Sequence, residues 1–155
     1  MLSIIMISGR KNPGFVEFVR SIQEWLSTQP DTYVELVFVD RLHEHRASVL
    51  KEAMDRIDQI YFKHLPDPEH TVSGPCPSSA RNHAVLNSKG DWIVSVDDLT
   101  TFKTGCLDRH LRAFELGFDA LAGAFETDGD EVDDRIEHGS SGLFIASRFY
   151  LSLIH

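Results

Sequence analysis

The stretch Asp91-Trp92-Ile93-Val94-Ser95-Val96-Asp97-Asp98 decides the fold of this chain. Its apolar middle is typical of a buried strand, and the run stops abruptly on two acids. It follows Gly90 and a short helical pattern, Ser79-Ala80-Arg81-Asn82. Open α/β sheets bind ligands at the carboxyl ends of their strands, so Asp97 and Asp98 are predicted to lie at such a rim. Carboxylate oxygens there suit Mg²⁺ or Mn²⁺, which commonly bridge to substrate phosphates.

The rest of the chain alternates apolar runs with segments of helical periodicity. Strands are predicted over Leu2–Ser8, Tyr33–Val39, Gln59–Leu65, Asp91–Asp97, Phe118–Phe125 and Gly142–Ala146. Helices are predicted after Asn12-Pro13, around Val49–Ile57, from Ser78 or Ser79 to near Gly90, and around Leu107–Phe114. Asn12 would cap the first helix, and a polar loop with His43 and His45 would precede the second. The alternation predicts an α/β fold: right-handed crossovers and a central, mostly parallel sheet flanked by helices.

Length and composition limit the class of protein. The chain has 155 residues, which predicts a single domain over residues 1–155. Its formal net charge of −9 argues against nonspecific nucleic-acid binding, which needs a basic face. Cys76 and Cys106 lie far apart and in no metal-ligand spacing, so a reduced, cytoplasmic protein is expected. No signal peptide or membrane span is expected either.

Several polar residues follow the predicted strands and should meet at one rim of the sheet. They are Ser8, Gly9, Arg10, Asp40, Asp97 and Asp98, with Arg81 on the preceding helix. Singly, an acid at a strand end is usually a turn or cap residue, and a lone arginine is usually a solvated charge. Their convergence predicts a binding site instead, in which Gly9 lets a ligand approach the backbone and Arg10 or Arg81 meets phosphate oxygens.

Three blocks of sequence, in a fixed order, carry a family resemblance. They are Ser3–Arg10 with the following helix, Glu35–Asp40, and Pro77–Asn82 leading into Gly90–Asp98. In order and spacing these blocks resemble the family 2 glycosyltransferases, which have the Rossmann-like GT-A fold. The resemblance covers Leu2 to about Arg148. It implies a hexosyltransferase that moves a sugar from a UDP- or GDP-linked donor to an acceptor hydroxyl, with Mn²⁺ or Mg²⁺.

Carried over by position, the resemblance implies a role for each site residue. Ser8, Gly9 and Arg10 would line the nucleotide pocket, Asp40 would face the nucleobase, and Arg81 would lie near the base or diphosphate. Asp97 would approach the ribose, and Asp97 and Asp98 would hold the metal. The second acid of the family's Asp-x-Asp motif, at its third position, is replaced by Leu99, so either Asp98 takes the metal role or metal affinity is reduced. The family's first-strand aromatic is absent, and Arg41 stands where an acid usually follows Asp40.

Other functions stay open at this stage. No catalytic base is identified, because the family's base belongs to a C-terminal acceptor segment that the chain is expected to lack. Acids of the segment Glu126–Gly139 are expected in a solvated surface loop. The alternatives are a non-catalytic nucleotide-sugar-binding module, a shortened or degenerate glycosyltransferase domain, or a nucleotidyltransferase. Apolar residues from Phe149 to Ile154 would pack on the sheet or support a homo-oligomer. The acceptor is unknown.

Overall fold

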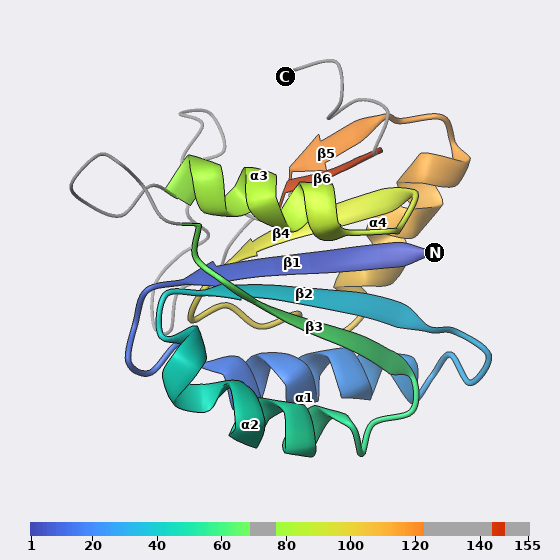
Figure 1. Ribbon diagram of the computed structural model, residues 1–155. Coiled ribbons are helices and arrows are strands. Elements are labelled where there is room, and N and C mark those ends of the chain that lie inside the picture. The colour runs from blue at the N-terminus through green and yellow to red at the C-terminus, as the bar shows by residue number, and fades with distance from the viewer. Residues whose placement is uncertain (69–76, 123–143, 148–155) are drawn as a thin grey trace, which may run out of the picture.

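The computed structural model describes residues 1–68, 77–122 and 144–147. Its strands and helices alternate along the chain (Figure 1). The strands are β1 (Leu2–Ser8), β2 (Val34–Asp40), β3 (Ile60–Pro66), β4 (Trp92–Asp97), β5 (Ala120–Ala122) and β6 (Phe144–Ser147). The helices are α1 (Phe15–Leu26), α2 (His43–Met54), α3 (Pro77–Asn87) and α4 (Cys106–Glu115). The predicted alternation of strands and helices is confirmed.

The described strands form one six-stranded sheet in the order β3-β2-β1-β4-β6-β5. Strands β3, β2, β1 and β4 run parallel, whereas β6 is antiparallel to both β4 and β5. The chain therefore has the predicted α/β architecture with a mostly parallel sheet. Strand order moves outward from β1 to β3 and then returns to the other side of β1 with β4. This reversal between β1 and β4 is a topological switch point, where sheets of this kind bind ligands.

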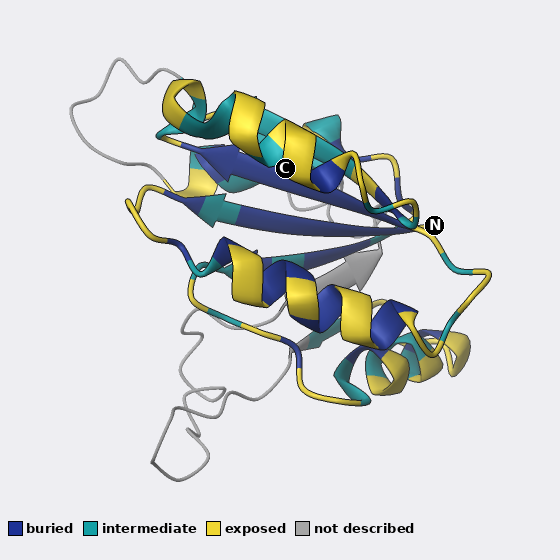
Figure 2. Cartoon of the chain, turned by 90° about the horizontal axis from the view of Figure 1, so that it is seen from below, coloured by how far each residue is buried: buried dark blue, intermediate teal, exposed yellow. Residues whose placement is uncertain are grey.

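Helices cover both faces of the sheet, as Figure 1 shows. Right-handed crossovers place α1 and α2 on one face and, because the strand order then reverses, α3 on the other. The larger apolar core lies beneath α1 and contains Phe18, Ile22 and Phe38, whereas a smaller one joins α3 to the sheet. In Figure 2 the inner strands are buried and the helices expose only their outer sides. Burial on both faces explains why β1 and β2 read as continuous apolar runs.

Three helix starts differ from the sequence-based expectation. Helix α1 begins at Phe15 after Gly14, whose φ of 69° is left-handed, so the prediction of Asn12 as cap and Pro13 as first helical residue is wrong. Helix α2 already begins at His43, so the expected polar loop around His43 and His45 is helical. Helix α3 begins at Pro77, before either predicted serine cap.

A buried polar cluster fixes the amino ends of the strands, opposite the predicted rim. The carboxylate of Glu35 accepts hydrogen bonds from the Ser3 hydroxyl at 2.6 Å, the Lys89 backbone N–H at 2.7 Å and Lys63 Nζ at 3.2 Å. Ser3 Oγ in turn accepts from the Gly90 N–H at 2.8 Å. These bonds hold the turn before β4 against β1 and β2, and so help to set where β4 begins.

Several predictions fall outside the described residues. They concern the acidic segment 126–139, the apolar residues 149–154, Cys76 and most of the proline-rich segment 66–77. Cys106 is a free thiol. No helix in the described part of the chain has both the length and the apolar character needed to cross a membrane.

Candidate functional site

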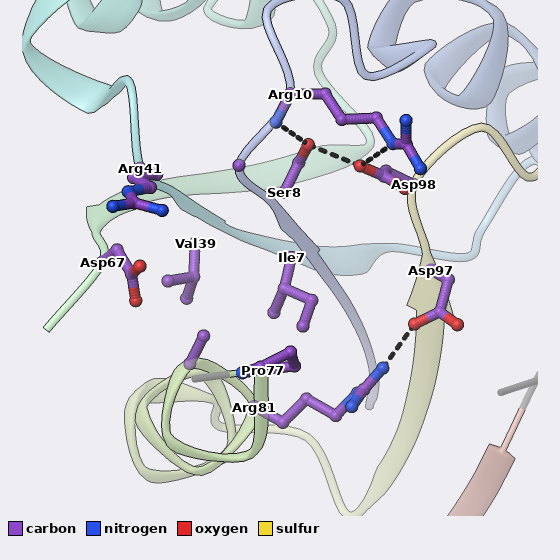
Figure 3. A pocket seen from close by; sticks show the side chains of 12 residues that line it. Ile7, Ser8, Arg10, Val39, Arg41, Asp67, Pro77, Arg81, Asp97 and Asp98 are labelled. Carbon is purple, nitrogen blue, oxygen red and sulfur yellow. Dashed lines mark hydrogen bonds and ion pairs between the residues drawn. The ribbon is translucent and has the colours of Figure 1, made fainter. Parts of the chain in front are cut away.

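A pocket of about 420 Å³ opens at the carboxyl ends of the parallel strands, over the switch point between β1 and β4. Its lining comes from the ends of β1, β2 and β4, the residue that follows β3, and the first turns of α3 (Figure 3). The lining residues are Ile7, Ser8, Gly9, Arg10, Val39, Arg41, Asp67, Pro77, Ala80, Arg81, Asp97 and Asp98. Six of the seven predicted site residues therefore lie together, and only Asp40 is not among them.

Asp98 is held by two groups from the end of β1. Its Oδ2 accepts a hydrogen bond from the Ser8 hydroxyl at 2.7 Å and lies 3.0 Å from Arg10 Nε. Ser8 Oγ also accepts the Arg10 backbone N–H at 3.0 Å. Ser8 therefore orients the carboxylate of Asp98 as well as lining the pocket. The Arg10 side chain is 61% exposed, so it has room to leave Asp98 for a ligand.

Asp97 is paired across the pocket with α3. Arg81 reaches from α3 and donates from Nη2 to Asp97 Oδ1 at 2.5 Å (Figure 3). Both side chains are partly exposed. The pocket thus contains two acids and two arginines in pairs, and their formal charges balance. An entering anion can draw the arginines away, while an entering cation can draw the carboxylates away.

Asp40 has a different environment from the other predicted site residues. Its side chain is fully buried, and its Oδ1 accepts the Leu42 N–H at 2.8 Å. Its Oδ2 lies 2.8 Å from Arg46 Nε and 3.0 Å from His64 Nε2. Arg46 Nη2 also donates to the Arg10 carbonyl at 2.7 Å. Asp40 therefore ties the start of α2 to β3 and, through Arg46, supports the loop after β1.

Arg41 and Asp67 line the pocket although sequence reasoning did not select them. Arg41 directly follows β2, and Asp67 directly follows β3. The Asp67 N–H donates to the Asp40 carbonyl at 3.2 Å, so these strand ends are neighbours. The feature that could have identified these two residues is their position, because each is a charged residue at the carboxyl end of a strand. In the sequence, Arg41 is recognisable only as a departure from the family pattern, and Asp67 stands in a proline-rich segment without a motif.

Leu99 follows the two acids in a left-handed conformation, with φ of 63°. Its N–H donates to the Pro13 carbonyl at 3.0 Å, and its side chain is not among those that line the pocket. A leucine rarely adopts such a φ, so the backbone is strained directly after Asp98. Of the two acids and the leucine in this motif, only Asp97 and Asp98 present side chains to the pocket.

The donor set fits a divalent metal only in part. The carboxylates of Asp97 and Asp98 are hard oxygen ligands suited to Mg²⁺ or Mn²⁺. Within the described residues, no cluster of three or more His, Cys, Asp or Glu side chains is in place to hold a metal ion. The chain therefore offers two carboxylates, as in sites where substrate phosphates and water complete the coordination.

Comparison with known proteins finds solved structures that are similar to this chain. No protein-family model matches the chain, and no curated protein sequence matches it. The structure is similar to TarS 1–349 of S. aureus, a glycosyltransferase, with a TM-score of 0.75 and 19% identity. This match covers 99% of the chain and 48% of TarS 1–349, so the chain spans about half the length of that protein. TarS 1–349 has been solved with UDP-GlcNAc and with UDP.

Two further solved structures are similar over nearly the whole chain. The mannosyltransferase PcManGT from Pyrobaculum calidifontis, in complex with GDP-Man and Mn²⁺, has a TM-score of 0.60 and 15% identity, covering 99% of this chain and 46% of that one. A 4-diphosphocytidyl-2C-methyl-D-erythritol synthase from Anaerococcus prevotii DSM 20548 has a TM-score of 0.61 and 10% identity, covering 99% and 74%. At these identities the likeness concerns the fold. The chain therefore has a GT-A-like fold, the one found in these glycosyltransferases.

Proposed function

We propose that the chain binds a nucleotide-diphospho-sugar and takes part in transferring the sugar to an acceptor hydroxyl, as a hexosyltransferase that uses a divalent metal. One observation carries the proposal. Two adjacent acids, Asp97 and Asp98, and two arginines, Arg10 and Arg81, line one pocket at the switch point of a GT-A-like sheet. Carboxylates for a metal and guanidinium groups for phosphates are what a nucleoside diphosphate requires.

In this proposal the diphosphate enters between the two ion pairs. Arg81 and Arg10 turn from their acids to the phosphate oxygens, and the guanidinium fork holds two oxygens at once. Asp97 and Asp98 are thereby released to hold Mn²⁺ or Mg²⁺. Ser8 keeps Asp98 oriented during the exchange, because its hydroxyl donates to Asp98 and accepts from the Arg10 N–H. Both arginines then stabilise the negative charge that grows on the leaving nucleoside diphosphate.

The bound metal would act as a Lewis acid that neutralises charge on the diphosphate. The proposal names no catalytic base and no acceptor. We also propose a cytoplasmic location, which the free Cys106 thiol supports. Mn²⁺ in the mannosyltransferase complex supports the choice of metal.

A nucleotidyltransferase is the second candidate, and the diphosphocytidyl-methylerythritol synthase favours it. That chemistry needs a Gly-rich, basic phosphate loop after the first strand. Residues 8–14 of this chain, Ser-Gly-Arg-Lys-Asn-Pro-Gly, offer only part of such a loop. A nucleotidyltransferase would join a sugar phosphate to the nucleotidyl group of a nucleoside triphosphate and release pyrophosphate, whereas a glycosyltransferase would release a nucleoside diphosphate from a nucleotide-sugar. A binding module would show nucleotide affinity and no turnover.

Calorimetric titration with UDP and GDP, with and without Mn²⁺, tests the donor site directly. We expect one of them to bind, more tightly with Mn²⁺, and we expect Asp97→Asn and Asp98→Asn to abolish the metal effect. Asp119→Asn is the matched control, because Asp119 is exposed and does not line the pocket. Unchanged binding and metal dependence in both pocket variants would reject the proposal. Product analysis with UDP- and GDP-sugars then separates transfer from binding alone.

A further inference from the structure

The pocket has two ends of different chemistry. Figure 3 shows Asp97, Asp98, Arg10 and Arg81 on one side, and Arg41 and Asp67 on the other, with Ile7 and Val39 between them. If the acids and arginines of the first side hold a diphosphate, the nucleoside must extend toward the second side. Apolar Ile7, Val39, Pro77 and Ala80 offer a surface suited to the flat face of a base.

Asp67 is an unsatisfied acceptor at this second end. Its Oδ1 is shielded from solvent and has no hydrogen-bond partner among the residues that the structure describes. Buried polar atoms are nearly always hydrogen-bonded, and because Asp67 lines the pocket, a turn of its side chain would offer this oxygen to a donor on a ligand. Asp40, which the family resemblance places opposite the base, instead has its carboxylate fully buried against Leu42, Arg46 and His64.

Arg41 supplies donors beside this acceptor. Asp67 and Arg41 follow neighbouring strands β3 and β2, and the Asp67 N–H bonds to the carbonyl of Asp40, the residue before Arg41. No ion pair between Arg41 and Asp67, or between either side chain and another residue, is found in the part of the chain that the structure describes. The wall therefore presents acceptors next to donors.

From this order of groups we infer that the site selects guanine, so that its donor is a GDP-linked sugar; this inference rests on the proposed function above. Guanine presents two adjacent donors, N2–H₂ and N1–H, followed by two acceptors, O6 and N7. A carboxylate accepts from both donors, and a guanidinium donates to the acceptors. Uracil has a single N–H between two carbonyl oxygens, so it would satisfy one oxygen of the Asp67 carboxylate and set a carbonyl oxygen against the other. Cytosine and adenine each lack the paired donors.

The first measurement compares GDP, UDP, CDP and ADP in calorimetric titrations with Mn²⁺. We expect GDP to bind about tenfold or more tightly than the others, which is the discrimination typical of one bidentate base contact. IDP, which lacks only the 2-amino group of guanine, should bind several-fold more weakly than GDP. This comparison uses the unmodified chain, so it does not depend on any variant folding.

A second measurement tests whether Asp67 is responsible for the preference for guanine. In Asp67→Asn the side chain offers one acceptor and one donor, which fits xanthine, whose C2 carries an oxygen instead of the amino group. We expect this variant to lose about tenfold in GDP affinity and to bind XDP more tightly than the unmodified chain does. Asp58→Asn, an exposed acid just before the other end of β3, is the matched control and should keep the preference for GDP. Arg41→Gln should also weaken GDP binding.

The outcomes separate this inference from the proposed function. Tight, metal-dependent binding of UDP, CDP or ADP in preference to GDP would overturn guanine selection and leave the donor site intact. A preference for GDP that persists in Asp67→Asn would overturn the role of Asp67. Failure of all four nucleotides to bind would overturn both proposals together.

Discussion

The Arg81 guanidinium, carried by α3, lies 2.5 Å from the carboxylate of Asp97 at the end of β4. This contact joins the two parts of the third block of the family resemblance, Pro77–Asn82 and Gly90–Asp98, and both residues line the pocket over the switch point. In the proposed reaction the same arginine must leave the carboxylate and bind the diphosphate. The pair is therefore a resting arrangement whose partners a ligand can exchange.

Replacement of Arg81 should separate binding from stability. Arg81→Gln removes a charged donor to the diphosphate, so we expect about tenfold weaker nucleotide affinity. Because Arg81 and Asp97 are partly exposed, the free energy of unfolding should change by less than about 1 kcal/mol. Calorimetry measures the first quantity and urea unfolding the second. Arg56→Gln breaks an exposed pair with Glu52 outside the pocket and should change neither one appreciably. Equal nucleotide affinity in both variants would contradict the phosphate role.

Glu35 should make stability depend on pH. Burial alone raises the pKa of Glu35, but the bonds from Ser3, the Lys89 N–H and Lys63 outweigh it and hold the pKa below its ordinary value of 4.5. A carboxyl whose pKa is lowered on folding contributes stability above its unfolded pKa, and this contribution is lost as pH falls through the folded pKa. We expect Glu35→Gln to cost about 2 kcal/mol at neutral pH.

The difference in free energy of unfolding between the unmodified protein and Glu35→Gln should shrink as the pH falls below 4.5. Urea unfolding between neutral and acidic pH measures it. Glu24→Gln alters an exposed glutamate on α1 and should show no such pH-dependent difference. A cost for Glu35→Gln that stays constant across the range would show that the charge of Glu35 is not responsible.

Gly90 is required by close packing before β4. A Cβ at this position would lie 2.6 Å from both the backbone N and the Oγ of Ser3, and 2.8 Å from the Met1 carbonyl. Two of these atoms are backbone and cannot move away easily, so Gly90→Ala should destabilise the fold by about 2–3 kcal/mol. At Gly9 a Cβ would meet only Arg41 carbons, the nearest at 3.6 Å, so Gly9→Ala should be nearly neutral. Thermal unfolding of both variants tests the contrast, which equal losses would refute.

Leu99 stores backbone strain that a substitution should release. Asparagine tolerates a φ of 63° better than leucine does, and the Leu99 side chain is 60% exposed, so little apolar burial is lost. We expect Leu99→Asn to raise the free energy of unfolding by about 1 kcal/mol. Leu116 is also exposed but has a φ of −83°, so Leu116→Asn should bring no gain. A similar effect of both substitutions in urea unfolding would rule out strain as the cause.

Much of the fold could be predicted from local patterns. Strands β1, β2 and β4 were recognised because strands buried on both faces read as continuous apolar runs. Helix starts were predicted less well. The Pro13 carbonyl accepts the N–H of Leu99, a residue far along the chain, and helix α1 begins only after Gly14. Cap preferences alone contain no information about such a contact.

The sequence by itself determined the parallel α/β sheet and brought Ser8, Arg10, Arg81, Asp97 and Asp98 to one rim, because the carboxyl ends of parallel strands must meet there. Only the tertiary structure decided how each polar group is used. Asp40 ends β2 and Asp67 directly follows β3, yet Asp40 is buried by Arg46 and His64, whereas Asp67 lines the pocket and has an oxygen without a partner among the described residues. The physical reason is that strand periodicity fixes where a side chain begins, whereas the partners it finds depend on which distant segments pack beside it.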